Sequence, residues 1–357
     1  MSIDLNQLSR REMLVMGLAA VSSLGMGGQL KDKEAAGEET EKKKGMKTGL
    51  VYDDIFLEHK TPAGFPERPE RLTAIIDRLE KEKILAQLVR LNYSPDGLEW
   101  IGTIHSQAYI EHVKRSCEEG FEYIDSLDVP ISSRSYEVAV AAVGGGLAGV
   151  DAVMQLKVRN VFCAVRPPGH HAVKNQAKGF CIFNNIAIAA RYIQKKYELR
   201  KILIVDWDVH HGNGTQDAFY DDPDILYFSI HRCPFYPGSG GKEERGAGKG
   251  LGYTINVPEP AGTGDKEYQK VFEEIFRPAA KAFKPDFVLI SAGFDAHIND
   301  PLGGMAVTSD GFGELTRVVK EIAETCCKGR IVSLLEGGYG LDGLARSVEA
   351  HLRVLMS

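Results

Sequence analysis

Residues 206–214 combine side chains that bind metals with side chains that move protons, in the order Asp-Trp-Asp-Val-His-His-Gly-Asn-Gly. Asp206, Asp208 and His210 have the same parity, so on an extended backbone their side chains leave one edge together. Carboxylates and a neutral imidazole suit a divalent metal such as zinc or iron. A single Asp-x-Asp-x-His pattern also fits a hydrogen-bonded network that caps a strand end, so the metal site is a hypothesis that needs the other segments.

Four further polar segments follow short apolar runs directly. They read Arg-Pro-Pro-Gly-His-His (166–171), Ser-Ile-His (229–231), Ser-Ala-Gly-Phe-Asp-Ala-His (291–297) and Glu-Gly-Gly-Tyr (336–339). Asp295, in the third of them, would complete a three-ligand set with Asp208 and His210 and leave a position open for water.

The remaining polar residues of these segments suit proton transfer. The pair His170 and His171 could move protons, with Asp206 or Asn213 available to orient it. Tyr339 follows a double glycine, where its hydroxyl could polarise a carbonyl group. Together these residue types suit metal-assisted hydrolysis of an amide.

The elements that must position these residues are visible as alternating apolar patterns. Runs of four or five residues that are apolar on both parities predict buried parallel strands at 161–165, 202–205, 225–228, 287–290 and 331–335. Helical spacing occupies 72–88, 136–155, 184–197, 268–283 and 312–327. The alternation predicts an α/β fold, a single domain whose central, mainly parallel sheet has helices on both faces. Ligands bind at the carboxyl ends of such strands, so the five polar segments should share one crevice.

Composition excludes several classes of protein. The chain has 357 residues, 43% of them hydrophobic, and a formal net charge of -6, which argues against a disordered chain, a polytopic membrane protein and a nucleic-acid partner bound through a basic surface. Its six cysteines include no Cys-x-x-Cys pair, so neither a disulfide framework nor a thiolate zinc site is expected. Cys163 and Cys181 are expected to be small core residues.

The first 47 residues differ from the rest. Arg10 and Arg11 precede an uncharged stretch at 13–30, which predicts a twin-arginine export signal over residues 1–30. A charged, disordered linker is expected at 31–47, and the folded domain at 48–357. We therefore expect export to the periplasm, with a cytoplasmic location or an uncleaved membrane anchor as alternatives. No stable membrane span is expected after processing, because this stretch is marginal for about 30 Å of hydrocarbon.

At the level of motifs, the chain from about Leu50 to the C-terminus resembles the zinc-dependent histone deacetylase and acetylpolyamine amidohydrolase family, which has the arginase–deacetylase fold. The resemblance is carried by 166–171, Gly-Phe-Cys-Ile-Phe-Asn-Asn at 179–185, 206–214, 292–295, Asp-Pro-Leu-Gly at 300–303 and 336–339. Asn213, where class I members have Asp, makes the chain similar to class II.

The resemblance implies a role for each matching residue. The metal ligands would be Asp208, His210 and Asp295. His171 would be the general base and acid, with His170 as its electrostatic partner, and Asp206 and Asn213 would orient these histidines. Tyr339 would donate a hydrogen bond in the transition state. The acyl-lysine tunnel would be formed by Phe180 and Tyr236 (more often Phe in the family), with Gly179, Leu302 and Gly338 shaping it and Asp128 at its rim. Potassium would bind at one site through Asp206, Asp208, His210, Ser229 and Ile230, and at a second through Phe219, Asp222, Ile225 and Tyr253.

These expectations amount to an amidohydrolase that removes acetyl or other acyl groups from acyl-lysine side chains with a metal-activated water. Zinc is the expected metal, with iron as an alternative, and potassium is a second cofactor. Three alternatives stay open: deacetylation of an acetylpolyamine or another small acylated amine, a two-manganese ureohydrolase, and a binding module that recognises acyl groups without catalysis. Leu302, where some polyamine enzymes carry an acidic residue, favours acyl-lysine peptides over acylated amines.

Overall fold

The computed structural model describes residues 45–93 and 97–357. The predicted export signal (1–30) and most of the predicted linker (31–47) lie outside these residues. The chain divides into Met1–Met46 and Lys47–Ser357, and every element described below belongs to the second unit.

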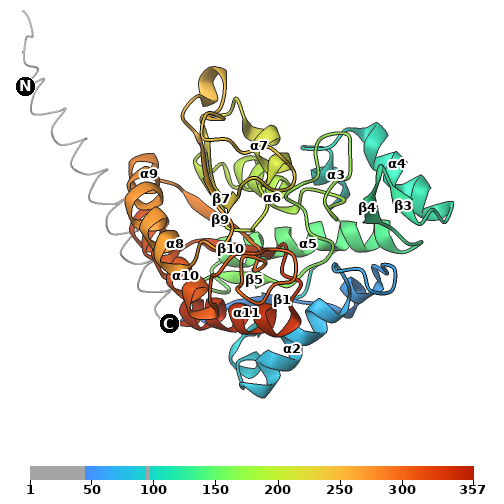
Figure 1. The fold of residues 1–357 in the computed structure, drawn as a ribbon, viewed down its shortest axis with the longest axis horizontal. Coiled ribbons are helices and arrows are strands. Elements are labelled where there is room, and N and C mark those ends of the chain that lie inside the picture. The colour runs from blue at the N-terminus through green and yellow to red at the C-terminus, as the bar shows by residue number, and fades with distance from the viewer. Residues whose placement is uncertain (1–44, 94–96) are drawn as a thin grey trace, which may run out of the picture. The chain divides into compact units, whose positions relative to one another are not determined.

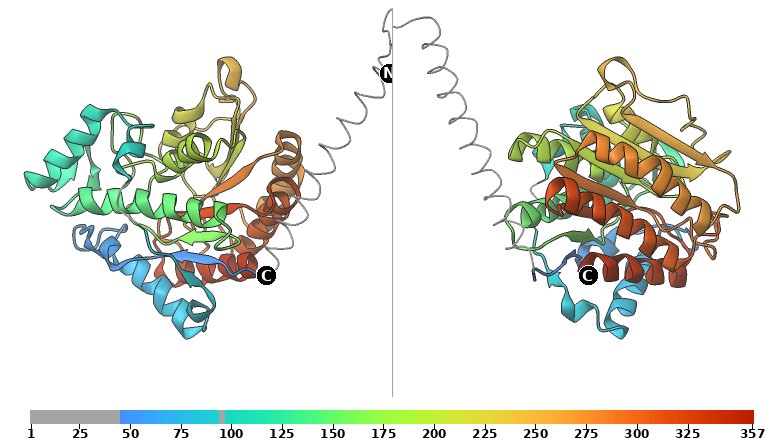
Figure 2. Two further views of the ribbon diagram at one scale, coloured as in Figure 1. Left: turned by 180° about the vertical axis from the view of Figure 1, so that it is seen from behind. Right: turned by 90° about the vertical axis from the view of Figure 1, so that its left-hand side faces the viewer.

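An eight-stranded sheet forms the centre of this unit, and all of its neighbouring strands are parallel (Figures 1 and 2). Its spatial order is β2-β1-β5-β10-β9-β6-β7-β8. The strands are β1 (Gly49–Val51), β2 (Val89–Arg90), β5 (Val161–Cys163), β6 (Ile202–Asp206), β7 (Ile225–Arg232), β8 (Thr254–Glu259), β9 (Phe287–Ala292) and β10 (Ile331–Leu335). Each of the five predicted apolar runs coincides with a strand or with part of one, whereas β1, β2 and β8 are not predicted from the sequence.

Helices cover both faces of the sheet, which explains why its central strands are apolar on both parities. One face carries α5 (Ser135–Met154), α6 (Asn185–Tyr197) and α7 (Asn213–Phe219). The other carries α8 (Asp265–Val271), α9 (Arg277–Phe283), α10 (Ser309–Cys327) and α11 (Leu341–Met356), seen in front of the strands in Figure 2, right. The helix α2 (Glu70–Lys81) packs on α11.

Two predicted helices differ from the observed ones. The pattern at 72–88 ends earlier, at Lys81, because Lys83 adopts a left-handed backbone with φ 57°, and a short 3-10 turn, η3 (Leu85–Gln87), follows. The pattern at 268–283 is divided by a π turn, η5 (Phe272–Phe276). Pro278, the second residue of α9, has no backbone N–H to donate to the preceding turn, which accounts for the wider turn before it.

Among the described residues, one helix, α5, is long and apolar enough to cross a membrane, and most of it is buried in this unit. Its neighbours are β1, β5 and β10, so it is a core helix of the α/β fold.

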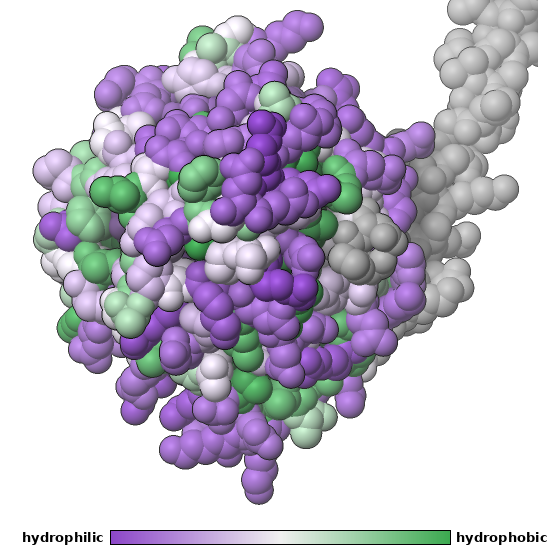
Figure 3. All heavy atoms as spheres, turned by 90° about the vertical axis from the view of Figure 1, so that its right-hand side faces the viewer, coloured by the Kyte–Doolittle hydropathy of each residue, from purple (hydrophilic) through white to green (hydrophobic). Residues whose placement is uncertain are grey.

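Smaller elements surround the sheet. An antiparallel pair, β3 (Tyr123–Ile124) and β4 (Ser126–Pro130), lies near α4 (Gln107–Glu118), and the other short pieces are η2 (Asp54–Glu58), α3 (Leu98–Ile101) and η4 (Gly248–Gly250). On the face drawn in Figure 3, hydrophobic side chains are scattered among hydrophilic ones.

Candidate active site

Four neighbouring strands at the centre of the sheet lead into the segments that carry the predicted catalytic and metal-ligating residues. In the order β5-β10-β9-β6, their carboxyl ends lead to the His170–His171 pair, to Tyr339, to Asp295 and to the segment 206–210. Parallel strands end at the same edge, so residues far apart in the sequence meet there. The structure thus brings the predicted catalytic and metal-ligating residues together.

Asp208, His210 and Asp295 form a compact group in which each residue offers one ligand atom, all within 4.8 Å of one another. Nδ1 of His210 lies 3.0 Å from Oδ1 of Asp208 and 3.2 Å from Oδ2 of Asp295. Backbone N–H groups hold the carboxylates: Val209 donates to Asp295 Oδ1 and Gly337 to Asp208 Oδ2, each at 2.8 Å. The three side chains are therefore fixed before any ligand arrives.

This group fits a divalent cation. Asp295 Oδ2 is buried and accepts no hydrogen bond in the described part of the chain, which is costly for a carboxylate oxygen. Beside it, Gly337 must lack a side chain, because a Cβ there would lie 2.1 Å from Asp295 Oδ2 and 2.6 Å from Asp208 Oδ2. Burial and the charge of Asp208 raise the pKa of Asp295, because both make its negative charge unfavourable. A bound cation would offset this cost.

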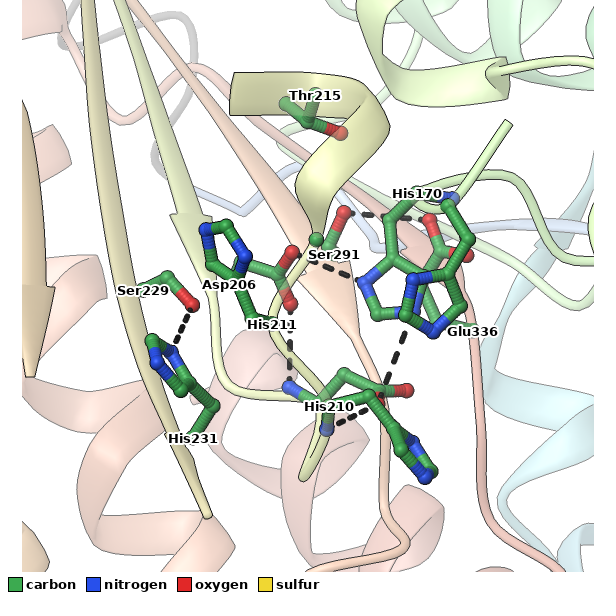
Figure 4. A network of polar contacts seen from close by, with 12 residues as sticks. His170, Asp206, His210, His211, Thr215, Ser229, His231, Ser291 and Glu336 are labelled. Carbon is green, nitrogen blue, oxygen red and sulfur yellow. Dashed lines mark hydrogen bonds and ion pairs between the residues drawn. The ribbon is translucent and has the colours of Figure 1, made fainter. Parts of the chain in front are cut away.

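The two histidines beside this group are held by different partners. His170 Nδ1 lies 3.1 Å from Oδ2 of Asp206, a contact drawn in Figure 4. His171 Nδ1 lies 2.8 Å from Oδ1 of Asn213, whose amide nitrogen donates to the carbonyl of His171. The Asn213 oxygen can only accept, so Nδ1 of His171 carries the proton and Nε2 keeps its lone pair.

The surroundings shift the pKa values of the two imidazoles in opposite directions. Burial alone would lower the pKa of His170, but the carboxylates of Asp208 and Asp206 raise it to about 10. Burial, together with the nearby His170 and His210, lowers the pKa of His171 well below its ordinary range. His171 therefore stays neutral, as a general base requires.

Glu336 supports the histidine pair, a role that is not predicted from the sequence. It is fully buried, and its Oε2 accepts hydrogen bonds from the backbone N–H groups of Gly169 (2.7 Å) and His170 (3.1 Å), while Oε1 accepts one from Ser291 (3.2 Å; Figure 4). Burial raises its pKa to about 7, against the influence of His170 and the backbone donors.

Tyr339 is fixed by Asp300 and Arg71, whose roles are not predicted from the sequence. Asp300 accepts four backbone N–H groups, those of Tyr339 (2.7 Å) and Gly340 through Oδ2 and those of Leu302 and Gly303 through Oδ1. Arg71 donates to the carbonyl of Gly338 at 2.6 Å and lies over the Tyr339 ring at 5.0 Å. Burial raises the pKa of Tyr339 well above its ordinary value, so its hydroxyl remains a donor.

Arg71 belongs to a buried ionic network. Glu67 pairs with Arg71 at 3.0 Å and with Arg166, which donates to both of its carboxylate oxygens. The sequence signal for this network is the charge-rich run Pro-Glu-Arg-Pro-Glu-Arg at 66–71, which ends in the first turn of α2.

Aromatic rings line the approach to these groups. Phe180 packs edge-on against Tyr339 at 5.6 Å, and Tyr236 packs edge-on against His171 at 5.1 Å. Gly179 must be glycine, since φ is +54° and a Cβ would lie 2.3 Å from the His171 ring. Two further rings, not predicted from the sequence, extend this wall: Phe65 packs against Phe180, and Phe235 stacks on His210.

The remaining predicted residues are placed as follows. Asp128 lies beside both aromatic walls, Leu302 lies in the turn held by Asp300, and the carbonyl of Gly338 is held by Arg71. Cys181 is buried, with its Sγ grouped with His170 and Glu336, but burial raises the pKa of its thiol well above the ordinary value. It is a core residue, as expected, and not a thiolate.

The residues named for potassium lie in two places. Asp206 and Ser229 are partners in the β6–β7 ladder, and the Ser229 hydroxyl lies 2.8 Å from Nδ1 of His231 (Figure 4). Ile230, one residue further along β7, pairs with Val257 of β8. In the second set, the backbone carbonyl of Phe219 accepts a hydrogen bond from the backbone N–H of Asp222. The backbone carbonyl of Tyr253 accepts one from the backbone N–H of Tyr227. The backbone N–H of Ile225 donates to the backbone carbonyl of Asp222 at 3.5 Å.

Comparison with known proteins identifies the family. The histone deacetylase domain model matches residues 65–355. The chain belongs to the histone deacetylase family. It is 40% identical over 300 residues to a "Probable deacetylase" of Archaeoglobus fulgidus, with 84% of this chain and 83% of that protein covered. The ureohydrolase alternative is thereby set aside.

Other family members are similarly close. "Polyamine deacetylase HDAC10" of Homo sapiens is 40% identical over 326 residues, which cover 87% of this chain and 48% of that protein. "Histone deacetylase 14, chloroplastic" of Arabidopsis thaliana is 41% identical, with 86% and 76% covered. The crystal structure of an HDA15 HD domain aligns with a TM-score of 0.83 at 37% identity, covering 87% of this chain and 88% of that one. This histone deacetylase family member is thus a hydrolase of the deacetylase type.

Proposed function

We propose that this deacetylase removes acetyl and related acyl groups from acyl-lysine side chains, with zinc held by Asp208, His210 and Asp295. The observation that carries the proposal is the three-ligand group, in which the buried Oδ2 of Asp295 accepts no hydrogen bond, beside an oriented, neutral His171. A two-carboxylate, one-imidazole set leaves room for substrate on the metal, as in other catalytic zinc sites. When bound, zinc would supply Lewis acidity to the amide carbonyl and lower the pKa of water.

The protein's own groups account for the remaining steps. Nε2 of His171 accepts the proton of the attacking water, and Asn213 keeps the ring in the tautomer that allows it. The Tyr339 hydroxyl donates a hydrogen bond to the tetrahedral oxyanion. The protonated His171, assisted by the charge of His170, then returns a proton to the leaving amine, so acetate and a free amine result.

Potassium is part of the same proposal, at the two sets of residues named from the family resemblance. The first set shares Asp206, Asp208 and His210 with the catalytic segment, so an ion there would stabilise the backbone that presents the zinc ligands. Removal of potassium should therefore lower the affinity for zinc, which a competition titration with a zinc indicator would measure.

The substrate class is supported by Leu302. An apolar residue at this turn attracts no second ammonium group, which favours acyl-lysine over acetylated polyamines. Rates on an acetyl-lysine peptide and on acetylspermidine, measured side by side on zinc-loaded protein, decide between them. A higher kcat/KM for acetylspermidine would reverse the assignment.

The test of the chemistry is Tyr339→Phe. Loss of one oxyanion donor costs about 3 kcal/mol, so we expect kcat on an acetyl-lysine peptide to fall by about 100-fold or more. The ring contacts with Phe180 and Arg71 do not involve the hydroxyl, so the thermal midpoint should stay unchanged. Full turnover by this variant would refute the role of Tyr339.

We also propose that the protein is exported by the twin-arginine route. The support is Arg10 and Arg11 before the uncharged stretch at 13–30, and a metal enzyme suits a route that carries folded proteins. Residues 1–46 fused to a reporter should direct it across the inner membrane, and changing both arginines to Lys should abolish this. Unchanged export of the Lys pair would contradict the proposal.

A further inference from the structure

A hydrogen bond joins Tyr236, one of the two aromatic walls, to Asp128, which also holds the other wall. The Tyr236 hydroxyl donates to Oδ2 of Asp128 at 3.0 Å. The other end of this tyrosine ring packs on His171, so the side chain extends from the catalytic base outward to Asp128. Tyr236 itself is 37% exposed, which places this contact at the opening of the site.

Asp128 also holds the opposite wall. Its Oδ2 accepts a second hydrogen bond from the backbone N–H of Gly179 at 3.1 Å, and its backbone carbonyl accepts one from Phe180 at 3.2 Å. These bonds fix Phe180 with φ 67°, a left-handed conformation that is unfavourable for an aromatic residue. One aspartate therefore positions both aromatic walls.

Few acceptor positions of Asp128 remain for a ligand. A carboxylate offers about four lone-pair positions. Gly179 and Tyr236 occupy the two on Oδ2, and the hydroxyl of Ser126 occupies one on Oδ1. A peptide that presented its N–H groups to this carboxylate would have to displace the Tyr236 hydroxyl to make more than one hydrogen bond.

We infer that Tyr236 is a specificity-determining residue: its hydroxyl occupies the Asp128 oxygen that peptide N–H groups would otherwise use. The site should therefore bind the acyl-lysine side chain with little dependence on the peptide backbone around it, so that a simple alkyl amide is used about as well as a peptide. This inference rests on the proposed deacetylase activity and deepens it, because it concerns the part of the substrate outside the tunnel.

The experiment compares two substrates that place the same chain in the tunnel. One is a peptide with a central acetyl-lysine, and the other is N-pentylacetamide, whose five carbons correspond to Cα–Cε of lysine without any backbone amide. For the zinc-loaded wild type we expect the two kcat/KM values to agree within about fivefold. In Tyr236→Phe, Oδ2 of Asp128 is free to accept a peptide N–H. A hydrogen bond to a charged acceptor strengthens binding by about tenfold or more. The ratio of peptide to amide kcat/KM should therefore rise about tenfold, mainly through a lower KM for the peptide.

Two controls separate this effect from loosening of the fold. Asp128→Asn combined with Tyr236→Phe should remove the gain, because the effect passes through the carboxylate. Tyr197→Phe deletes a similar tyrosine–aspartate bond, to Asp151 at 2.7 Å, between α6 and α5, and should leave the ratio unchanged. An unchanged or lower ratio in Tyr236→Phe, or a gain that persists without the Asp128 carboxylate, would overturn the inference. Absence of acetate release from both substrates by the wild type would instead refute the proposed function.

Discussion

At the scale of single residues, the site depends on buried carboxylates that bind backbone N–H groups. Glu336 accepts the N–H groups of Gly169 and His170, and Asp300 accepts four N–H groups from two loops. Each such bond fixes a main-chain segment and not only a side chain, so the catalytic groups on that segment have little freedom. Pre-organisation of this kind lowers the cost of reaching the transition state.

Glu336 allows a test with a matched pair of variants. Glu336→Ala leaves the N–H groups of Gly169 and His170 buried without acceptors, so the free energy of unfolding should fall by about 2 to 4 kcal/mol. The kcat should fall at least tenfold, because the His170–His171 turn loses its support. In Glu336→Gln the amide oxygen can still accept both N–H groups while its nitrogen donates to Ser291.

Urea unfolding and acetate release, measured on the same preparations, check this prediction. The Gln variant should keep most of the stability and activity. If Ala and Gln behave alike, the negative charge of Glu336, and not its hydrogen bonds, is what matters.

At the scale of elements, the sequence was sufficient wherever a strand is buried on both faces and ends in a polar motif. β5, β6, β7, β9 and β10 are of this kind, and their motifs carry the predicted catalytic residues. The missed strands β1 and β2 have three and two residues, too short for any periodicity, and β8 is a partly exposed edge.

Long-range partners could not be predicted, since they depend on the packing of separate loops. The acceptor role of Asp300, the ionic network of Arg71 and Glu67, and the bond between Tyr236 and Asp128 join residues up to 267 positions apart. Sequence motifs show which residues have the right chemistry, but not which of them satisfy one another.

His351 shows how one buried side chain joins several elements. It lies on α11, and its ring nitrogens contact the hydroxyls of Thr316 on α10 (2.7 Å) and Ser333 on β10 (2.9 Å). Trp207 packs edge-on against its ring. Burial lowers its pKa to about 3, so it is neutral in the folded protein.

Stability should therefore fall in mild acid. The unfolded chain binds a proton at His351 near its ordinary pKa of about 6.5, whereas the folded chain does so only near 3. The contribution of neutral His351 is fully present above pH 6.5 and is lost as the pH falls toward 3, by about 1.4 kcal/mol per pH unit. His59 and His105, whose pKa values burial lowers to about 4, add to the same trend.

Urea unfolding between pH 5 and 7 measures this slope. His351→Gln should be less stable at pH 7 but should depend less steeply on pH, by about one proton. Equal slopes in the variant and the wild type would show that His351 does not titrate in this way.

At the scale of the whole molecule, the parallel sheet concentrates negative charge at one point of its carboxyl edge. Asp206, Asp208 and Asp295 come from the ends of β6 and β9, which are neighbours, and all three are buried. Such a group is unfavourable without a cation, because desolvation and mutual repulsion both oppose it. Burial of these carboxylates is therefore a cost at this edge of the sheet that a bound cation would offset.

Metal removal should reveal that cost as lost stability. A ligand present at 100 times its Kd stabilises the folded state by about 2.7 kcal/mol, and 1 kcal/mol corresponds to about 1.5 °C in a domain of about 300 residues. Treatment with a chelator should thus lower the thermal midpoint by about 4 °C, and added zinc should restore it. Asp295→Asn is the matched control, because it removes one ligand and one charge at a fixed volume. Its midpoint should not respond to the chelator and should equal or exceed that of the metal-free wild type, since the repulsion with Asp208 is gone. A chelator response of the same size in both proteins would place the metal elsewhere than on Asp208, His210 and Asp295.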